Sequence, residues 1–104
     1  MRIGVDLIEI ERIRDALARY GDTFKHRCFT EAEREYCDSK PNPPQHYAGR
    51  FAAKEAVGKA LGSGVYLEGR TAAWADKVGA GRIELSMTHS RELAAAVAVV
   101  VDEE

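Results

Sequence analysis

Three charged residues, Asp6, Glu55 and Lys59, are of the types that can hold a divalent cation and an anionic group together. Asp6 interrupts the apolar run RIGVDLIEI, and a charge in an apolar strand is costly unless it is paired, hydrogen-bonded or bound to metal. Mg²⁺ is usually held by one or two carboxylates together with substrate phosphates and water. If the strand of Asp6 packs beside a helix that carries Glu55 and Lys59, the two carboxylates can converge on one Mg²⁺ ion while Lys59 faces a phosphate.

Simpler explanations exist for the same residues. Glu55 and Lys59 are four residues apart in the favourable order, so they could form a surface salt bridge worth about 0.3–0.5 kcal/mol. Asp6 could end its strand and cap a turn. The alanines of RFAAKEAVGKALG (50–62) follow helical spacing. They could serve tight packing of a helix on a sheet, or they could leave room for a ligand.

The first half of the chain predicts one strand and three helices. A strand is expected over Arg2–Ile10, followed by a helix with an apolar face that ends at Gly21. A short helix begins at Thr30, with Glu33 three residues on as a capping box. A proline-punctuated loop over 39–45 precedes the alanine-rich helix, which we expect from about residue 46 to Leu61.

The second half predicts a turn and brief strand after Gly62, a helix over 70–79, and two strands, RIELSMTHS and LAAAVAVVV, joined by a short turn around residues 90–92. These elements indicate an α+β fold in one domain spanning 1–104, with a small antiparallel sheet packed against the long alanine-rich helix.

Bulk composition excludes several classes of protein. The net charge is −2, and no dense basic stripe with exposed aromatic residues is present, which disfavours a nucleic-acid-binding protein. No apolar stretch is long enough to cross a membrane, and acidic residues near the N-terminus exclude a signal peptide there. Two cysteines, Cys28 and Cys37, are too few for a disulfide framework, so we expect reduced thiols and a cytoplasmic protein.

Several motifs, taken in order, resemble one known family. GVDLIEIERI, FTEAEREYC, AGRFAAKEAVGKALG, LSMTHS and AAAVAVVV look like the corresponding segments of the holo-acyl-carrier-protein synthases, the small phosphopantetheinyl transferases. The resemblance covers nearly the whole chain. It implies the 4′-phosphopantetheinyl transferase-like fold, and transfer of phosphopantetheine from coenzyme A to a serine of apo acyl carrier protein, with release of adenosine 3′,5′-bisphosphate.

The resemblance also assigns roles to individual residues. It implies that Asp6 and Glu55 bind Mg²⁺, that Lys59 contacts a coenzyme A phosphate, and that His89 contacts the nucleotide end of coenzyme A. Arg50 matches a position that meets a coenzyme A phosphate. Glu55 and Lys59 are then the catalytic candidates. The acceptor of the serine proton stays open between Glu55 and a metal-bound water.

Carrier-protein docking is expected on the first helix. Arg12 and Arg19 lie with Ala16 on the side opposite the apolar stripe. In the resembled family, the arginine six residues after the metal aspartate helps to dock the acidic carrier protein, which indicates Arg12. A solvated helix face is the simpler explanation for any one of these charges.

Family members are usually longer, with a further loop, strand and turn after the segment that matches KALG. The chain is therefore either an enzyme or a shortened non-catalytic homologue that binds carrier protein or coenzyme A. The resembled family also forms trimers, with the metal carboxylates on one subunit and the histidine on the next, so we expect a homotrimer with sites between subunits.

Overall fold

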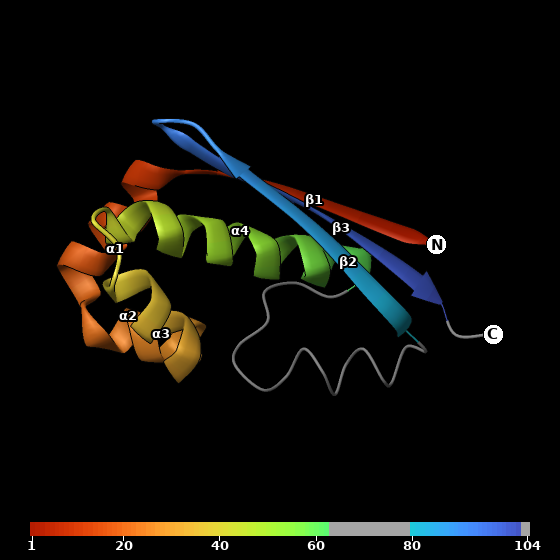
Figure 1. Cartoon of the computed structure of the whole chain (residues 1–104), viewed down its shortest axis with the longest axis horizontal. Coiled ribbons are helices and arrows are strands. Elements are labelled where there is room, and N and C mark those ends of the chain that lie inside the picture. The colour runs from red at the N-terminus through yellow and green to blue at the C-terminus, as the bar shows by residue number, and fades with distance from the viewer. Residues whose placement is uncertain (63–79, 103–104) are drawn as a thin grey trace.

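The computed structural model describes residues 1–62 and 80–102. These residues form, in chain order, β1 (Arg2–Glu9), α1 (Ile10–Tyr20), α2 (Asp22–Cys28), α3 (Glu31–Asp38), α4 (Pro43–Ala60), β2 (Ala80–His89) and β3 (Leu93–Asp102) (Figure 1). The α+β class is confirmed. The strand expected after Gly62 and the helix expected over 70–79 lie outside the described residues, and the single domain over 1–104 stays a prediction.

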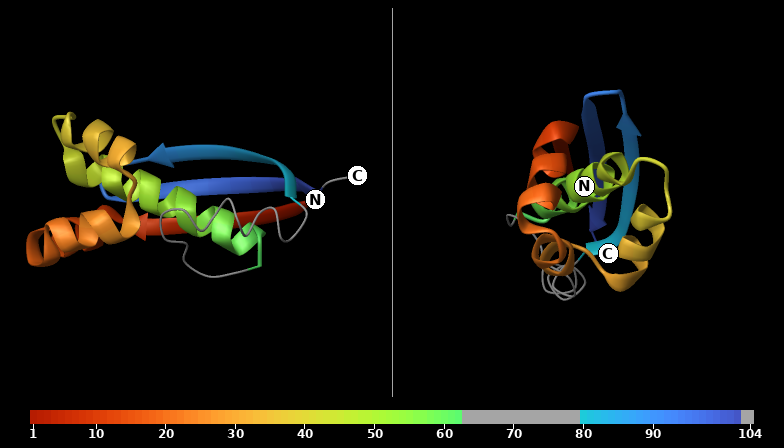
Figure 2. Two further views of the ribbon diagram at one scale, coloured as in Figure 1. Left: turned by 90° about the horizontal axis from the view of Figure 1, so that it is seen from below. Right: turned by 90° about the vertical axis from the view of Figure 1, so that its left-hand side faces the viewer.

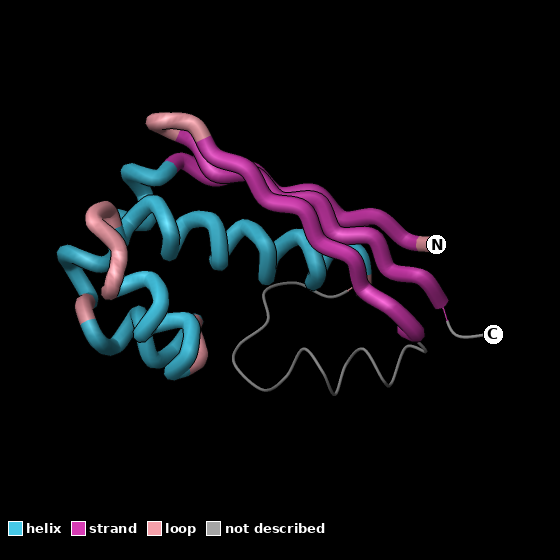
Figure 3. Tube along the Cα trace, viewed as in Figure 1, coloured by secondary structure: helices cyan, strands magenta, loops and turns pink. Residues whose placement is uncertain are grey.

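The three described strands form one antiparallel sheet in the order β1-β3-β2 (Figure 3). β3 therefore lies between β1 and β2, with Asp6 of β1 opposite Ala96 and His89 of β2 opposite Ala94. A tight turn joins β2 to β3, because the hydroxyl of Ser90 accepts the backbone N–H groups of residues 92 and 93 at 3.3 and 3.1 Å. The turn predicted at 90–92 is confirmed.

The long helix α4 covers one face of this sheet, as the view from below in Figure 2 shows. Alternate residues of β3 point toward α4 and are buried: Ala94, Ala96, Ala98 and Val100. The residues between them point away from α4. On this outer sheet face the side chains of Ile3, Val5 and Leu7 are 62%, 55% and 61% exposed, and that of Val97 is 39% exposed.

Small residues allow β1 and α4 to approach very closely. A Cβ atom built on Gly4 would lie 1.9 Å from the carbonyl oxygen of Ala56 and 2.7 Å from the backbone nitrogen of Ala60. Ala53, Ala56 and Ala60 are themselves 6%, 0% and 3% exposed. The alanines therefore serve tight packing of the helix on the sheet, and the alternative that they leave room for a ligand is wrong.

The remaining helices pack at one end of α4 and form a second apolar cluster around the ring of Tyr47. Phe29 meets this ring edge to face at a centroid distance of 4.8 Å. The predicted capping box is confirmed, since the Thr30 hydroxyl accepts the Glu33 N–H at 3.1 Å and the Glu33 carboxylate accepts the Thr30 N–H at 2.8 Å.

The structure differs from the sequence analysis in two places in this region. The alanine-rich helix begins at Pro43, not near residue 46, because proline is well suited to the first turn, where its missing N–H is not needed. The loop therefore ends at Asn42, the helix N-cap. The second is α2, a helix of seven residues that sequence periodicity did not predict. It starts directly after Gly21, whose φ of +51° ends α1 as expected.

Candidate functional site

Asp6 and Lys59 meet where β1, an outer strand of the described sheet, crosses the C-terminal half of α4. The Lys59 ammonium lies 3.0 Å from Oδ1 of Asp6 and also donates to the backbone oxygen of Val5 at 3.0 Å. The Asp6 side chain is 14% exposed and that of Lys59 is 52% exposed. The cost of placing a carboxylate in an apolar strand is thus offset by a cation that reaches it from the helix.

Glu55 lies one helical turn before Lys59 and joins the same group. Burial raises the pKa of the Glu55 carboxyl, the nearby negative charge of Asp6 raises it further, and Lys59 opposes both effects. Two carboxylates and one ammonium therefore share one electrostatic environment. Within residues 1–62 and 80–102 Lys59 pairs with Asp6, not with Glu55, so the simpler explanation of a Glu55–Lys59 surface salt bridge is wrong.

The donor set at this point suits Mg²⁺. Within the described residues, no three His, Cys, Asp or Glu side chains gather closely enough to hold a metal ion. Mg²⁺ does not need such a cage, because one or two carboxylates suffice when water and substrate phosphates complete its octahedron. Asp6 and Glu55 therefore fit a magnesium ion that is shared with a phosphorylated substrate.

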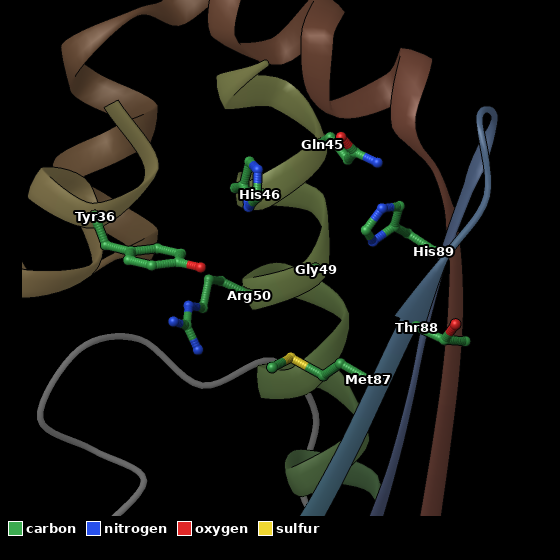
Figure 4. Close-up of a pocket in the computed structure, with 8 residues that line it drawn as sticks. All are labelled: Tyr36, Gln45, His46, Gly49, Arg50, Met87, Thr88 and His89. Carbon is green, nitrogen blue, oxygen red and sulfur yellow. The ribbon is translucent and has the colours of Figure 1, made fainter. Parts of the chain in front are cut away.

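Arg50 and His89 lie in a separate pocket between α3, the N-terminal half of α4 and the end of β2 (Figure 4). Its lining residues are Tyr36, Gln45, His46, Gly49, Arg50, Met87, Thr88 and His89. The Tyr36 ring organises the α3 side of this pocket: the Arg50 guanidinium lies over it at 4.9 Å, and the His46 ring meets it edge to face at 5.8 Å.

Basic side chains gather in this pocket. It contains no acidic side chain among its lining residues, and the Lys40 ammonium lies 4.6 Å from the centre of the Tyr36 ring at its border. The pKa of His46 is lowered, first by burial and then by the positive charges of Lys40, His89 and Arg50. Arg50 in the pocket and Lys40 at its border supply positive charge, the two histidine rings can donate hydrogen bonds, and no lining residue is acidic, so the pocket is suited to a phosphate group.

Sequence reasoning missed Tyr36, Lys40 and His46 in this pocket. His46 stands four residues before Arg50, and that spacing on a helix is the signal that could have indicated a shared basic face. Tyr36 and Lys40 gave no comparable signal, because their place in the pocket depends on how α3 packs against α4.

The two groups of residues lie on opposite sides of α4. Glu55 follows Arg50 by five positions, which corresponds to about 140° around a helix. Asp6 of the first group lies on β1 and His89 of the second group lies on β2, and these strands form the two edges of the described sheet. The structure thus brings Asp6, Glu55 and Lys59 together, and Arg50 and His89 together, but it keeps the two groups apart.

The two arginines predicted for carrier-protein docking share one surface of α1. Arg12 and Arg19 border a shallow hollow together with Asp15, Ala16 and Tyr20. The Tyr20 side chain is 57% exposed. The surface is therefore mixed, with Asp15 beside the two arginines.

Similar proteins carry one consistent description. Holo-[acyl-carrier-protein] synthase from Chlamydia pneumoniae is 40% identical over 121 residues, covering 97% of this chain and 97% of that protein. The Chlamydia trachomatis serovar D protein of the same name is 44% identical over 117 residues, covering 93% and 96%. An alignment of 121 positions is longer than this chain of 104 residues, which confirms that relatives carry additional residues.

Solved structures agree with these sequence relatives. Helicobacter pylori holo-[acyl-carrier-protein] synthase in complex with coenzyme A has a TM-score of 0.80 at 27% identity, and the match covers 95% of this chain and 99% of that chain. The Bacillus anthracis synthase in complex with CoA (3′,5′-ADP) has a TM-score of 0.74 at 30% identity, with coverages of 99% and 96%. No helix in the described part of the chain is both long and apolar enough to cross a membrane.

A sequence profile of the 4′-phosphopantetheinyl transferase superfamily matches residues 2–100. Together with relatives at 40–44% identity over nearly the whole chain, this match shows that the chain belongs to the 4′-phosphopantetheinyl transferase superfamily.

Proposed function

We propose that this protein is a holo-acyl-carrier-protein synthase that transfers 4′-phosphopantetheine from coenzyme A to a serine of apo acyl carrier protein. The observation that carries the proposal is the meeting of Asp6, Glu55 and Lys59 at the crossing of β1 and α4. The name shared by its relatives supports the same activity.

The reaction is a phosphoryl transfer. A bond forms between the serine Oγ and the phosphorus that bears pantetheine, the bond from this phosphorus to the bridging pyrophosphate oxygen breaks, and adenosine 3′,5′-bisphosphate leaves. Such a transition state requires mainly positioning and neutralisation of charge. Lys59 has three N–H donors, of which two are directed at Asp6 and Val5. Within residues 1–62 and 80–102 its third donor has no acceptor, and we assign that donor to an oxygen of the pyrophosphate.

Glu55 is the candidate acceptor for the serine proton. Its raised pKa makes the carboxylate a stronger base than an exposed glutamate. Asp6 contributes to this raised pKa, so the two carboxylates have linked roles even though only one of them needs to accept a proton.

Asp6 and Glu55 are also the residues that would hold Mg²⁺. When it is bound, Mg²⁺ supplies positive charge that stabilises the pyrophosphate oxygens and the departing bisphosphate. Asp6 and Glu55 would hold the ion through their carboxylate oxygens, beside the Lys59 ammonium that lies 3.0 Å from Asp6.

We further propose that the complete site lies between subunits of a homotrimer. One coenzyme A molecule must reach both the Asp6 group and the basic pocket, which lie on opposite sides of α4. The pocket has a volume of about 240 Å³, below the roughly 300–1,000 Å³ typical of sites that enclose a small molecule. A second chain would supply the missing surface.

The outer sheet face supports this assembly. Ile3, Val5, Leu7 and Val97 expose apolar surface on neighbouring strands, and contiguous exposed apolar patches commonly mark an interface. Three copies that bury this face by head-to-tail contacts would form a closed ring. We assign carrier-protein docking to the α1 surface of Arg12 and Arg19, whose charges suit an acidic partner, and a cytoplasmic location accords with the free thiols of Cys28 and Cys37.

The direct test is incubation with apo acyl carrier protein, coenzyme A and Mg²⁺, followed by mass spectrometry of the carrier protein. The proposal predicts that the carrier protein gains the mass of one phosphopantetheine group and that adenosine 3′,5′-bisphosphate appears in equal amount. The rival function, a shortened homologue that binds without turnover, predicts binding of coenzyme A or carrier protein with no change in the mass of the carrier protein.

A further inference from the structure

The Lys59 ammonium is held by two acceptors on β1. It donates to Oδ1 of Asp6 and to the backbone oxygen of Val5, each at 3.0 Å. The Lys59 side chain is 52% exposed and that of Asp6 is 14% exposed, so the lysine is the partner that reaches solvent. Lys59 is therefore paired with one of the two carboxylates that the proposed function assigns to Mg²⁺.

This pairing lowers the attraction of the group for a divalent cation. The carboxylates of Asp6 and Glu55 and the ammonium of Lys59 together carry one net negative charge. The affinity of an oxygen site for a divalent cation rises with the number of its charged ligands. The ammonium neutralises Asp6, and it also repels a dication bound to the same carboxylate, because charges a few ångströms apart interact strongly near a protein surface. Without further negative charge, the group is a weak cation site.

We infer that Lys59 makes binding of the divalent cation dependent on coenzyme A. The inference rests on the proposed function, which makes coenzyme A the substrate and Asp6 and Glu55 the metal ligands. The pyrophosphate of coenzyme A brings negative charge that offsets the ammonium, and it provides the acceptor for the third N–H of Lys59. The cation and coenzyme A therefore bind cooperatively, and each strengthens binding of the other by the same factor.

Lys59→Gln tests this inference, because glutamine removes the charge and keeps an N–H donor. Lys59 is exposed and belongs to neither apolar cluster, so the fold should stay intact. The probe is Mn²⁺, which suits the same oxygen ligands as Mg²⁺ and whose free concentration is measured by electron paramagnetic resonance. Without coenzyme A, Lys59→Gln should bind Mn²⁺ with a Kd about 10-fold lower than that of the wild type.

The same titration is repeated with saturating coenzyme A and no carrier protein, and a titration without enzyme corrects for Mn²⁺ bound by coenzyme A alone. Coenzyme A should lower the Kd of the wild type for Mn²⁺ by at least about 10-fold. It should lower that of Lys59→Gln by a smaller factor, because the repulsion that coenzyme A offsets is already gone.

Three variants serve as controls. Lys59→Arg keeps the positive charge and should bind Mn²⁺ as weakly as the wild type. Lys54→Gln removes the same charge from α4 at a lysine that pairs with Glu33 at 2.9 Å, and it should leave the Kd for Mn²⁺ unchanged. Adding Asp6→Asn to Lys59→Gln should abolish the gain in affinity, because the carboxylate that the substitution released is gone. Circular dichroism and urea unfolding establish that each variant is folded.

Several results would overturn the inference. The first is an equal or higher Kd of Lys59→Gln for Mn²⁺ without coenzyme A, and the second is an equal gain in Lys54→Gln, which would indicate only a change in total charge. A gain that survives Asp6→Asn would place the cation elsewhere. If Lys59→Gln does not fold, the wild type still decides, since a Kd for Mn²⁺ that coenzyme A leaves unchanged would exclude the coupling.

Failure of the proposed function gives a different result. In that case the wild type leaves the mass of apo acyl carrier protein unchanged in the presence of coenzyme A and Mg²⁺. If the wild type modifies the carrier protein and Lys59→Gln binds Mn²⁺ as weakly as the wild type does, only the inference about Lys59 fails.

Discussion

Gly4→Ala should separate the edge strand β1 from α4. The added Cβ would lie 1.9 Å from the carbonyl oxygen of Ala56 and 2.7 Å from the nitrogen of Ala60. Both are backbone atoms, so no side chain can rotate to relieve the overlap. To restore an ordinary contact of about 3.5 Å, the strand and the helix must move apart by roughly 1.5 Å.

The expected loss of stability is large for a single methyl group. Overpacking usually costs about 1–3 kcal/mol, and a clash with the backbone falls at the upper end of this range. Replacing glycine also reduces the entropy of the unfolded chain, which favours folding by about 0.4–1 kcal/mol. The clash is the larger effect, so we expect the free energy of unfolding to fall by about 2 kcal/mol and the Tm by roughly 8–16 °C.

Catalysis should suffer separately from stability. Asp6 lies two residues after Gly4 on the same face of β1, and its 3.0 Å contact with Lys59 would lengthen beyond hydrogen-bonding distance if the strand moved by roughly 1.5 Å. Displacement of reacting groups by about 1 Å typically reduces the rate by about 100-fold. We therefore expect a similar fall in kcat even at a temperature at which the variant is fully folded.

Urea unfolding followed by circular dichroism, and the rate of carrier-protein modification at low temperature, measure the two effects. Gly49→Ala is the matched control for stability, because a Cβ atom there meets no heavy atom within 4 Å among the described residues. Wild-type stability within about 0.5 kcal/mol together with an unchanged rate in Gly4→Ala would refute the idea that close packing of β1 on α4 positions the site.

Four further predictions follow from the site and the fold. Removal of divalent cations with excess chelator should abolish transfer of phosphopantetheine, and added Mg²⁺ should restore it. Full activity in excess chelator would show that the reaction needs no divalent cation. Arg12→Glu should raise KM for the carrier protein by about 10-fold while the Kd for coenzyme A stays unchanged. Added salt should likewise raise the KM of the wild type for the carrier protein, because exposed charges are screened within about 8–10 Å. If Arg12→Glu weakens binding of the carrier protein and of coenzyme A equally, Arg12 has no docking role. Burial raises the pKa of the Cys37 thiol to about 11, so the unfolded chain loses this proton at a lower pH than the folded protein does. The free energy of unfolding of the wild type should therefore fall between about pH 9 and 11, by up to about 1.4 kcal/mol per pH unit. If the free energy of unfolding of Cys37→Ala falls equally steeply with pH, this thiol is not the cause. Asp6→Ala and His89→Ala, each impaired alone, should recover about a quarter of wild-type activity when equal amounts exchange subunits at random in a ring, whereas confirmed exchange without recovery would place the whole site in one chain.

The elements that carry the site could be predicted largely from local sequence. The spacing of Glu55 and Lys59 predicted a shared helix face, and Asp6 in an apolar strand predicted that something charged would meet it. Asp6, Glu55 and Lys59 come together only because β1 packs against α4. The small residues along α4 make this close packing possible. The actual partner of Asp6, the Lys59 ammonium at 3.0 Å, followed only from the three-dimensional arrangement.

Other parts of the molecule depend on contacts between residues distant in sequence. α2 has only seven residues, too few for a clear periodic pattern, and is held by burial of Cys28 in the cluster around Tyr47. The basic pocket joins Tyr36 of α3, His46 of α4 and His89 of β2, so no single segment predicts it. Pro43 begins α4, although a run of prolines in a sequence is typical of a loop, because the first turn of a helix tolerates proline.

The central claim is that the Asp6, Glu55 and Lys59 group carries the transfer of phosphopantetheine. The most direct measurement is the initial rate of holo carrier protein formation by the wild type and by Glu55→Gln at equal folded concentration, with Mg²⁺ and saturating coenzyme A. Glutamine keeps the size of the side chain but removes the charge needed for a metal ligand and a proton acceptor. We predict a fall of at least about 1,000-fold, with unchanged circular dichroism and retained binding of adenosine 3′,5′-bisphosphate at the basic pocket. Equal rates for the wild type and Glu55→Gln would contradict the claim.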